Sequence, residues 1–298
     1  MTSELTTAAR LGFAPQARVL IVNADDFGLC HDENRATIEG MTNGIFTSAT
    51  ILAPAPGFDE AAEFARGCPL ADLGVHLTLN SEWQDWRWAP VLGPDAVPSL
   101  VDQDGFLWRE VSAVFKHAKV DQAQAELRAQ IDKTIAAGID PTHLDCHMGP
   151  LHLRADFHEL YVRLARDYRL PIRVTPRPIL RRLGLDHIVA QLDQAGIFYP
   201  DNLVIGGRRT PESANEYWTE TIRKLPPGIS EIYCHPAYAS AKLRAFAHDA
   251  AKREADFRFF TGPGVREHIA QQGIQLIGYR RLRDAMRGGK TRSELLWN

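Results

Sequence analysis

The chain has 298 residues, of which 45% are hydrophobic and 24% are charged, and this balance excludes a disordered chain. Its 34 basic and 37 acidic side chains give a net charge of −3, which excludes the strong positive field of a nucleic-acid-binding protein. No apolar run approaches the roughly 18 residues of a transmembrane helix, and the first sixteen residues lack the features of a secretory signal, so we expect a cytoplasmic protein.

From residue 18 onward, short strand-forming runs alternate with longer helical patterns. In the first part of the chain, this pattern predicts strands at 18–24, 48–53 and 72–79 and helices at 32–43 and 58–66. The segment from Asn80 to Glu110 interrupts the alternation, because it contains four tryptophans and three prolines and has no sustained period. We interpret it as a long insertion over one rim of the fold.

The alternation resumes after this insertion. It predicts strands at 142–148, 171–175, 202–205, 231–235 and 275–279, and helices at about 120–137, 155–168, 179–194, 213–225 and 264–272. Seven or eight such repeats without a glycine-rich dinucleotide-binding loop predict an α/β fold, namely an irregular TIM-like (β/α) barrel of mostly parallel strands. We expect an N-terminal arm over residues 1–17 and a single barrel domain over 18–298, with the insertion at about 80–110 on its rim.

Polar residues stand at the ends of four of these strands. Because the active sites of parallel barrels lie at the C-terminal ends of the strands, these residues are candidates for chemistry. They are Asp25 and Asp26 after the first strand, His76 in the third, His147 in the fourth and His235 in the seventh. If the chain forms a barrel, two adjacent carboxylates and three or more histidines converge on one rim.

Asp26, His76 and His147 together match the ligand set of a divalent metal site. Imidazole and carboxylate suit zinc and related ions, and three protein ligands leave positions open for water and substrate. The separations between these residues match no local motif such as HExxH, so only their strand-end positions predict that they meet. Taken singly, a strand histidine is more often a hydrogen-bonded structural residue, and a loop aspartate is more often a helix cap.

Asp25 and Asp26 are neighbours, and neighbouring side chains of a strand point to opposite faces. Both can reach one centre only if the backbone turns irregularly there, and Gly28 is consistent with such a turn. A carboxylate beside a metal-bound water can take its proton, which would make Asp25 the general base while Asp26 binds the ion.

Two further charged residues each allow more than one interpretation. Asp145 shares a strand face with His147, so it either orients that histidine or is a structural turn carboxylate. Arg173, in the fifth predicted strand, either orients Asp25 or binds an anionic substrate group, or it forms an ordinary salt bridge at the rim. The ordinary salt bridge is the more common case.

Four segments resemble the successive signatures of the YdjC/ChbG family of carbohydrate deacetylases, which includes HpnK-like deacetylases of hopanoid biosynthesis. They are NADDFG at 23–28, GVHLTL at 74–79, THLDCH at 142–147 and CHPAY at 234–238, and their order and spacing agree over about 18–280. The resemblance implies an irregular (β/α) barrel that hydrolyses an N-acetyl group from an amino sugar or glycoconjugate. It also implies metal ligands at Asp26, His76 and His147, a base at Asp25 and an acid at His235.

The implied cofactor is one divalent metal ion, with zinc and magnesium as the first choices. The resemblance also makes a homodimer plausible. The implied partner is an N-acetylated sugar or glycoconjugate, and neither nucleic acid nor a transmembrane segment is expected.

In one place the chain departs from many members of the family, which continue the fourth-strand motif with further histidines. Here MGPL separates His147 from His152, so the substrate side of the pocket can differ. The tryptophans of the insertion fit either stacking on sugars or packing on the barrel.

Two rival functions remain open at this point. One is a metal hydrolase that acts on another amide or an ester. The other is a non-catalytic carbohydrate-binding barrel that has kept the shape of the site, against which the presence of both acid and base residues argues. Metal-dependent release of acetate would separate the deacetylase from the binding protein.

Overall fold

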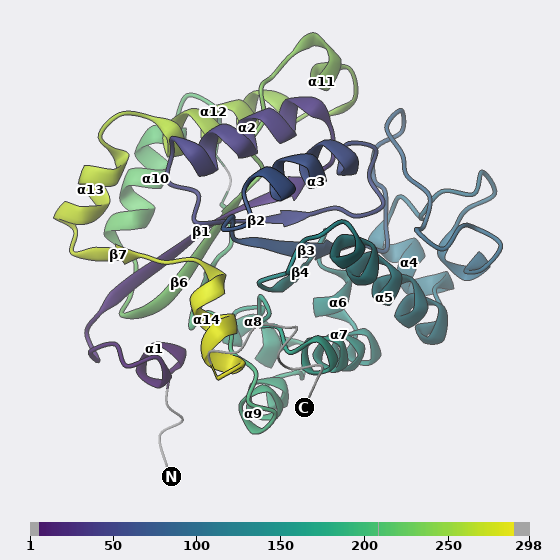
Figure 1. Cartoon of the computed structure of the whole chain (residues 1–298), viewed down its shortest axis with the longest axis horizontal. Coiled ribbons are helices and arrows are strands. Elements are labelled where there is room, and N and C mark those ends of the chain that lie inside the picture. The colour runs from purple at the N-terminus through teal and green to yellow at the C-terminus, as the bar shows by residue number, and fades with distance from the viewer. Residues whose placement is uncertain (1–5, 208, 289–298) are drawn as a thin grey trace.

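The computed structural model describes residues 6–207 and 209–288, and a curved parallel sheet lies at its centre (Figure 1). The strands are β1 (Arg18–Phe27), β2 (Ser48–Ile51), β3 (Leu73–Leu77), β4 (Leu144–Cys146), β5 (Asn202–Val204), β6 (Gly228–Cys234) and β7 (Ile274–Leu276). Their spatial order is β4-β3-β2-β1-β6-β5, and β7 also pairs with β1. Every pairing is parallel.

The sheet curls into a half-barrel that does not close among the described residues. The predicted α/β class and the parallel pairing are confirmed, but the predicted strand at 171–175 is not formed. That segment makes a single isolated bridge between Ile172 and Leu144, and the Ile172 amide donates to the carbonyl of Phe198. Pro171 and Pro176 bracket the segment and cannot donate to a ladder, so β4 and β5 remain without a continuous strand between them.

β1 is the central strand, and both of its faces are covered, as is usual for a parallel sheet. Leu20 and Val22 share an apolar cluster with side chains of α10 (Ala214–Arg223) and α12 (Ala250–Thr261). Val19 and Ile21 face the opposite side and cluster with side chains of α14 (Tyr279–Met286). This alternation along VLIV explains why the run reads as an uninterrupted apolar strand.

The helices cover both faces of the sheet. In Figure 1, α2 (His31–Thr42), α3 (Phe58–Gly67) and α12 lie above the strands, and α7 (Ala155–Tyr168), α8 (Arg177–Arg182) and α9 (His187–Gln194) lie below. The remaining helices are α1 (Thr7–Arg10), α4 (Val111–His117), α5 (Val120–Ala136), α6 (Pro150–Leu153), α11 (Ala241–Phe246), α13 (Val265–Gln271) and the 3₁₀ turn η1 (Pro98–Leu100). Across the described part of the chain, none of these helices combines the length and apolar character needed to cross a bilayer.

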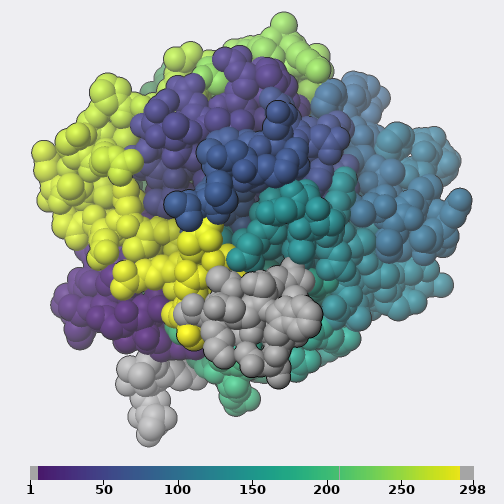
Figure 2. All heavy atoms as spheres, in the orientation of Figure 1, coloured from purple at the N-terminus to yellow at the C-terminus, as the bar shows by residue number. Residues whose placement is uncertain are grey.

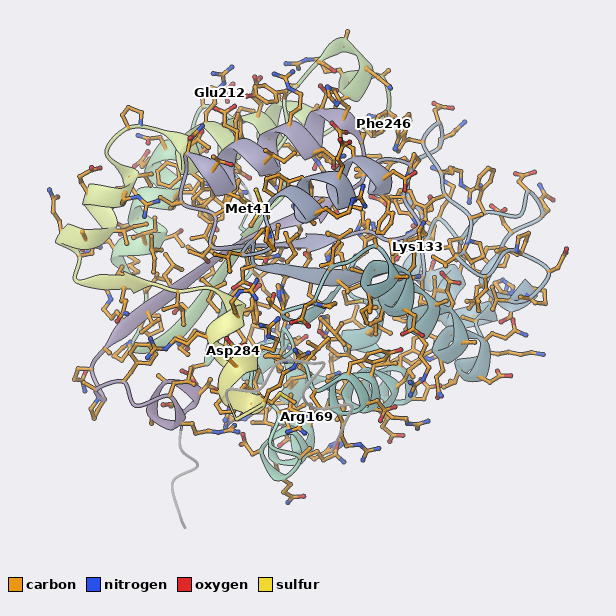
Figure 3. The ribbon with its side chains drawn as sticks, in the orientation of Figure 1. Met41, Lys133, Arg169, Glu212, Phe246 and Asp284 are labelled. Atoms are coloured by element: carbon orange, nitrogen blue, oxygen red, sulfur yellow. The ribbon has the colours of Figure 1, made fainter. Side chains whose placement is uncertain are left out.

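The residues from 80 to 110 form a largely irregular segment, which we call the insertion. Apart from η1, it has two isolated bridges, Asn80 with Trp108 and Val101 with Leu107. Its side chains form the blue lobe at one side of the molecule in Figure 2. The Trp86 ring stacks on Phe246 of α11 with centroids 5.0 Å apart and planes at 8°, and Figure 3 labels that phenylalanine. The insertion is therefore anchored by aromatic packing.

Candidate active site and metal centre

The end of β1 is irregular, as two adjacent carboxylates facing one centre require. The register between β1 and β2 shifts between Ala24 and Phe27, and Asp26 has a φ of 64°. A non-glycine residue in this left-handed region is uncommon and is held there only by its surroundings. Because of this bulge, Asp25 and Asp26 line the same cavity.

This cavity has a volume of about 480 Å³ and lies at the C-terminal ends of the strands. It brings together all five site residues predicted from the sequence: Asp25, Asp26, His76, His147 and His235. Glu82, Arg173 and Arg253 add further charged side chains to the lining. Strands far apart in the sequence thus deliver carboxylates and imidazoles to one open cavity.

Asp26, His76 and His147 form a compact set of metal-ligand atoms. Asp26 Oδ1 lies 3.3 Å from His76 Nε2 and 3.1 Å from His147 Nδ1. One donor atom from each of the three buried side chains lies within 4.8 Å of the other two. One carboxylate oxygen and two imidazole nitrogens at this spacing fit a single divalent ion.

Each histidine of this set has a carboxylate on its other ring nitrogen. His76 Nδ1 lies 2.6 Å from Asp145 Oδ1, which leaves His76 Nε2 facing Asp26. Asp145 therefore orients His76 and not His147, because the register of β3 and β4 places His76 directly beside Asp145. His147 Nε2 instead lies 2.8 Å from Glu82 Oε2 of the insertion. Sequence reasoning missed Glu82, which lies inside the insertion, is not the residue that ends a strand and belongs to no periodic segment.

The second oxygen of Asp26 is also held. Arg253 Nη1 donates to Asp26 Oδ2 at 2.9 Å and also contacts Glu33, while Arg253 Nε donates to Asp249. Arg253 lies on α12, which the sequence pattern did not predict, so this buried guanidinium was missed as well.

The charges of this cluster shift the acidities of the histidines. Burial alone would lower the pKa of His76, but Asp145 and Asp26 raise it to about 9. Burial opposes the protonation of His147 too, yet Glu82 and Asp26 raise the pKa of His147 well above its usual value. The site therefore attracts cations, and a metal ion would compete there with protons.

Asp25 is held by a buried arginine. Arg173 Nη1 donates to Asp25 Oδ2 and Nη2 to Oδ1, both at 2.7 Å, and Asn23 Nδ2 donates to Oδ1 at 2.8 Å. Burial alone would raise the pKa of Asp25, but the Arg173 guanidinium lowers it to about 2. Asp25 is thus an oriented carboxylate that stays ionised at neutral pH.

Arg173 also contacts two further carboxylates. Its Nε donates to Glu231 Oε1 at 2.9 Å, and its Nη1 lies 3.0 Å from Asp145 Oδ2. Only 5% of its side chain is exposed, so it does not form the ordinary rim salt bridge that was the more common case. Of the sequence-based alternatives, orientation of Asp25 is the one that matches its contacts.

His235 follows β6 directly and lies on the open side of the cluster. Its Nε2 is 3.9 Å from Asp26 Oδ2, and 35% of its side chain is exposed. Partial burial lowers the pKa of His235, and Asp26 opposes this effect. An imidazole in this position can exchange protons with a molecule bound in the cavity.

Comparisons with known proteins agree with the motifs and the fold. A family described as YdjC-like protein matches residues 19–271. A carbohydrate deacetylase of Thermoanaerobacter pseudethanolicus is 31% identical over 271 residues, which cover 88% of this chain and 98% of the relative. A chitooligosaccharide deacetylase of Yersinia pestis is 29% identical over 266 residues, covering 87% and 97%.

A solved structure shares the architecture. A crystal structure from Enterococcus faecalis, described provisionally as a cellobiose-phosphate cleavage protein, is similar with a TM-score of 0.76 and 29% identity. The match covers 89% of this chain and 99% of that one. Since the family match spans most of the chain, the resemblance seen in the motifs is confirmed, and the chain belongs to the YdjC-like family.

Proposed function

We propose that the chain is a metal-dependent hydrolase that removes an N-acetyl group from an amino sugar or glycoconjugate. The observation that carries this proposal is the convergence of a metal-ligand set, an oriented carboxylate and a partly exposed imidazole on one cavity. The names of the relatives, carbohydrate and chitooligosaccharide deacetylases, support the removal of an acetyl group and the carbohydrate class of substrate.

Asp26, His76 and His147 would hold one divalent ion, zinc or magnesium. When bound, such an ion supplies positive charge that polarises the acetyl carbonyl and makes water more acidic. The two carboxylates that face the ring nitrogens of His76 and His147 hold these imidazoles in fixed orientations.

Asp25 is the general base of the proposed reaction. Its Oδ1 already accepts from Arg173 and Asn23, whereas its Oδ2 accepts from Arg173 alone among the residues that the structure describes. Oδ2 therefore has the free lone pair that takes a proton from water as the oxygen of that water bonds to the acetyl carbon.

His235 completes the reaction as the general acid. When the bond between the acetyl carbon and the sugar nitrogen breaks, the leaving nitrogen needs a proton, and His235 Nε2 can supply it because the side chain lines the cavity. The products are acetate and a free amino sugar.

Replacing His235 by Ala is expected to leave the metal bound and to lower kcat by about 10²-fold or more, because the leaving amine loses its proton donor. Turnover and metal content are measured together on the purified variant. His248→Ala is the matched control, since that histidine is exposed beside the insertion and should retain full turnover. Unchanged turnover in His235→Ala would assign this residue a structural role.

The proposed function is tested by metal analysis of the purified chain and by measuring acetate release from a panel of N-acetylated sugars. We expect acetate release that a chelator abolishes and that added metal restores. Release from esters but not from amides would favour the other hydrolase. Sugar binding without any release would favour a binding protein.

A further inference from the structure

The imidazole of His147 is enclosed by two residues of the insertion. Glu82 Oε2 lies 2.8 Å from His147 Nε2, and the Glu82 side chain is only 17% exposed. The buried Trp88 packs its ring against the same imidazole, with centroids 5.8 Å apart and planes at 63°. The opposite ring nitrogen, His147 Nδ1, faces Asp26 Oδ1 at 3.1 Å.

We propose that Glu82 is a positioning residue for the metal site: it accepts the Nε2 proton of His147 and so keeps the Nδ1 lone pair directed at the ion. This inference rests on the metal-binding part of the proposed function. A neutral imidazole carries one N–H and one lone pair, and the hydrogen bond made by one nitrogen decides which of the two faces the metal. Without an acceptor at Nε2, the proton can move to Nδ1 and block coordination.

The arrangement mirrors the one at His76 but has a different origin. Asp145 accepts from Nδ1 of His76 and comes from β4, within the sheet. Glu82 accepts from Nε2 of His147 and comes from the insertion. Glu82 contacts the ring nitrogen of His147 that is opposite the one facing Asp26, so its role is to hold a ligand and not to be one.

The insertion holds Glu82 firmly enough for this role. The adjacent Trp83 packs edge-on against Phe246 with centroids 5.9 Å apart, and Trp86 stacks on the same ring. Trp86 Nε1 donates to the carbonyl of Leu29 at 3.0 Å. These contacts fix the backbone on the C-terminal side of Glu82, so the aromatic packing of the insertion contributes to the order of the metal site.

The experiment measures the affinity of the metal-free full chain for Zn²⁺ alone, by competition with a chromophoric chelator. Zn²⁺ is a suitable probe even if the resident ion is Mg²⁺, because imidazole ligands favour it. Glu82→Ala is expected to weaken Zn²⁺ binding by about 10- to 100-fold. This is the usual effect of removing a carboxylate that hydrogen-bonds to a metal-binding histidine. Glu82→Gln is expected to retain most of the affinity, because the amide oxygen can still accept the Nε2 proton.

Two further measurements separate this role from others. Asp85→Ala removes a negative charge from an exposed position on the same segment and should bind Zn²⁺ like the wild type. Nitrogen NMR of the His147 ring is recorded on the metal-free chain at a pH high enough for the ring to be neutral, and it is expected to show the Nε2–H form in the wild type and a mixture in Glu82→Ala.

Three outcomes would overturn the inference. The first is unchanged Zn²⁺ affinity in Glu82→Ala, and the second is an equal loss of Zn²⁺ affinity in Glu82→Ala and Asp85→Ala. The third is a rise in the KM of Glu82→Ala without any other change, which would indicate a substrate contact. Absence of Zn²⁺ binding by the wild type would overturn the proposed function together with the role of Glu82, whereas failure of Glu82→Ala alone leaves the proposed function standing.

Discussion

Asp25→Asn is expected to retain its metal and to release acetate about 10²- to 10⁴-fold more slowly than the wild type. Asparagine preserves the size of the side chain and one acceptor for Arg173, but it removes the basic Oδ2 that we assign to proton abstraction. Metal content and kcat are measured on the same sample, and thermal unfolding confirms that the variant is folded.

The neighbouring variant Asp26→Asn provides the matched comparison. Here a neutral amide oxygen replaces an anionic ligand, so the affinity for the metal itself should fall. Asparagine tolerates a positive φ better than most residues, so the bulge at 64° is not an obstacle. Equal loss of metal in Asp25→Asn and Asp26→Asn would show that the assignment of base and ligand is wrong.

Arg173→Met is expected to lower the free energy of unfolding by about 3–5 kcal/mol, because it leaves buried carboxylates without their cation. Those carboxylates are Asp25, Asp145 and Glu231, and all three lie within 3.0 Å of the guanidinium nitrogens. Urea denaturation measures the loss. Arg173→Lys, which keeps the charge but not the paired geometry, should fall between Arg173→Met and the wild type.

The control for this prediction is a surface ion pair. Arg128 pairs with Asp167, and about a third of each side chain is exposed. Arg128→Met is therefore expected to cost no more than about 1 kcal/mol. Similar losses for Arg173→Met and Arg128→Met would contradict the view that Arg173 neutralises a buried cluster.

The strand-end residues could be predicted from the sequence because each follows or belongs to a visibly apolar run. β1 shows this best, since VLIV leads directly into the two carboxylates. For Asp145, neither interpretation open from the sequence included His76, because alternation along one strand does not reveal the register across two. That register places His76 beside Asp145. Side-chain partners across strands depend on pairing, which a single sequence does not display.

The residues that were missed come from segments without a readable period. α12 buries Arg253 and Asp256 together with Phe257 and Phe260, so charged and apolar positions share its inner face. A pattern of apolar residues alone does not reveal such a helix. Glu82 lies in the irregular insertion, where no periodicity exists to place it. The pattern of apolar residues also could not predict that the barrel is incomplete. PIRVT at 171–175 has the composition of a strand, although Pro171 begins it and Pro176 follows it.

The gap between β4 and β5 allows substrate range to evolve separately from folding. Most of the cavity wall there comes from loops and the short helices α6 and α8, including Met148, Leu153, Ile179 and Ile205, and not from a hydrogen-bonded strand. Substitutions among these side chains break no ladder of the sheet, so they can reshape the wall at little cost in stability. The opposite wall of the cavity is built by β1, β3 and β6. Its side chains belong to the buried charged cluster, so they cannot be substituted as freely. Variation among relatives in the molecules they accept is therefore expected to concentrate on the side of the gap.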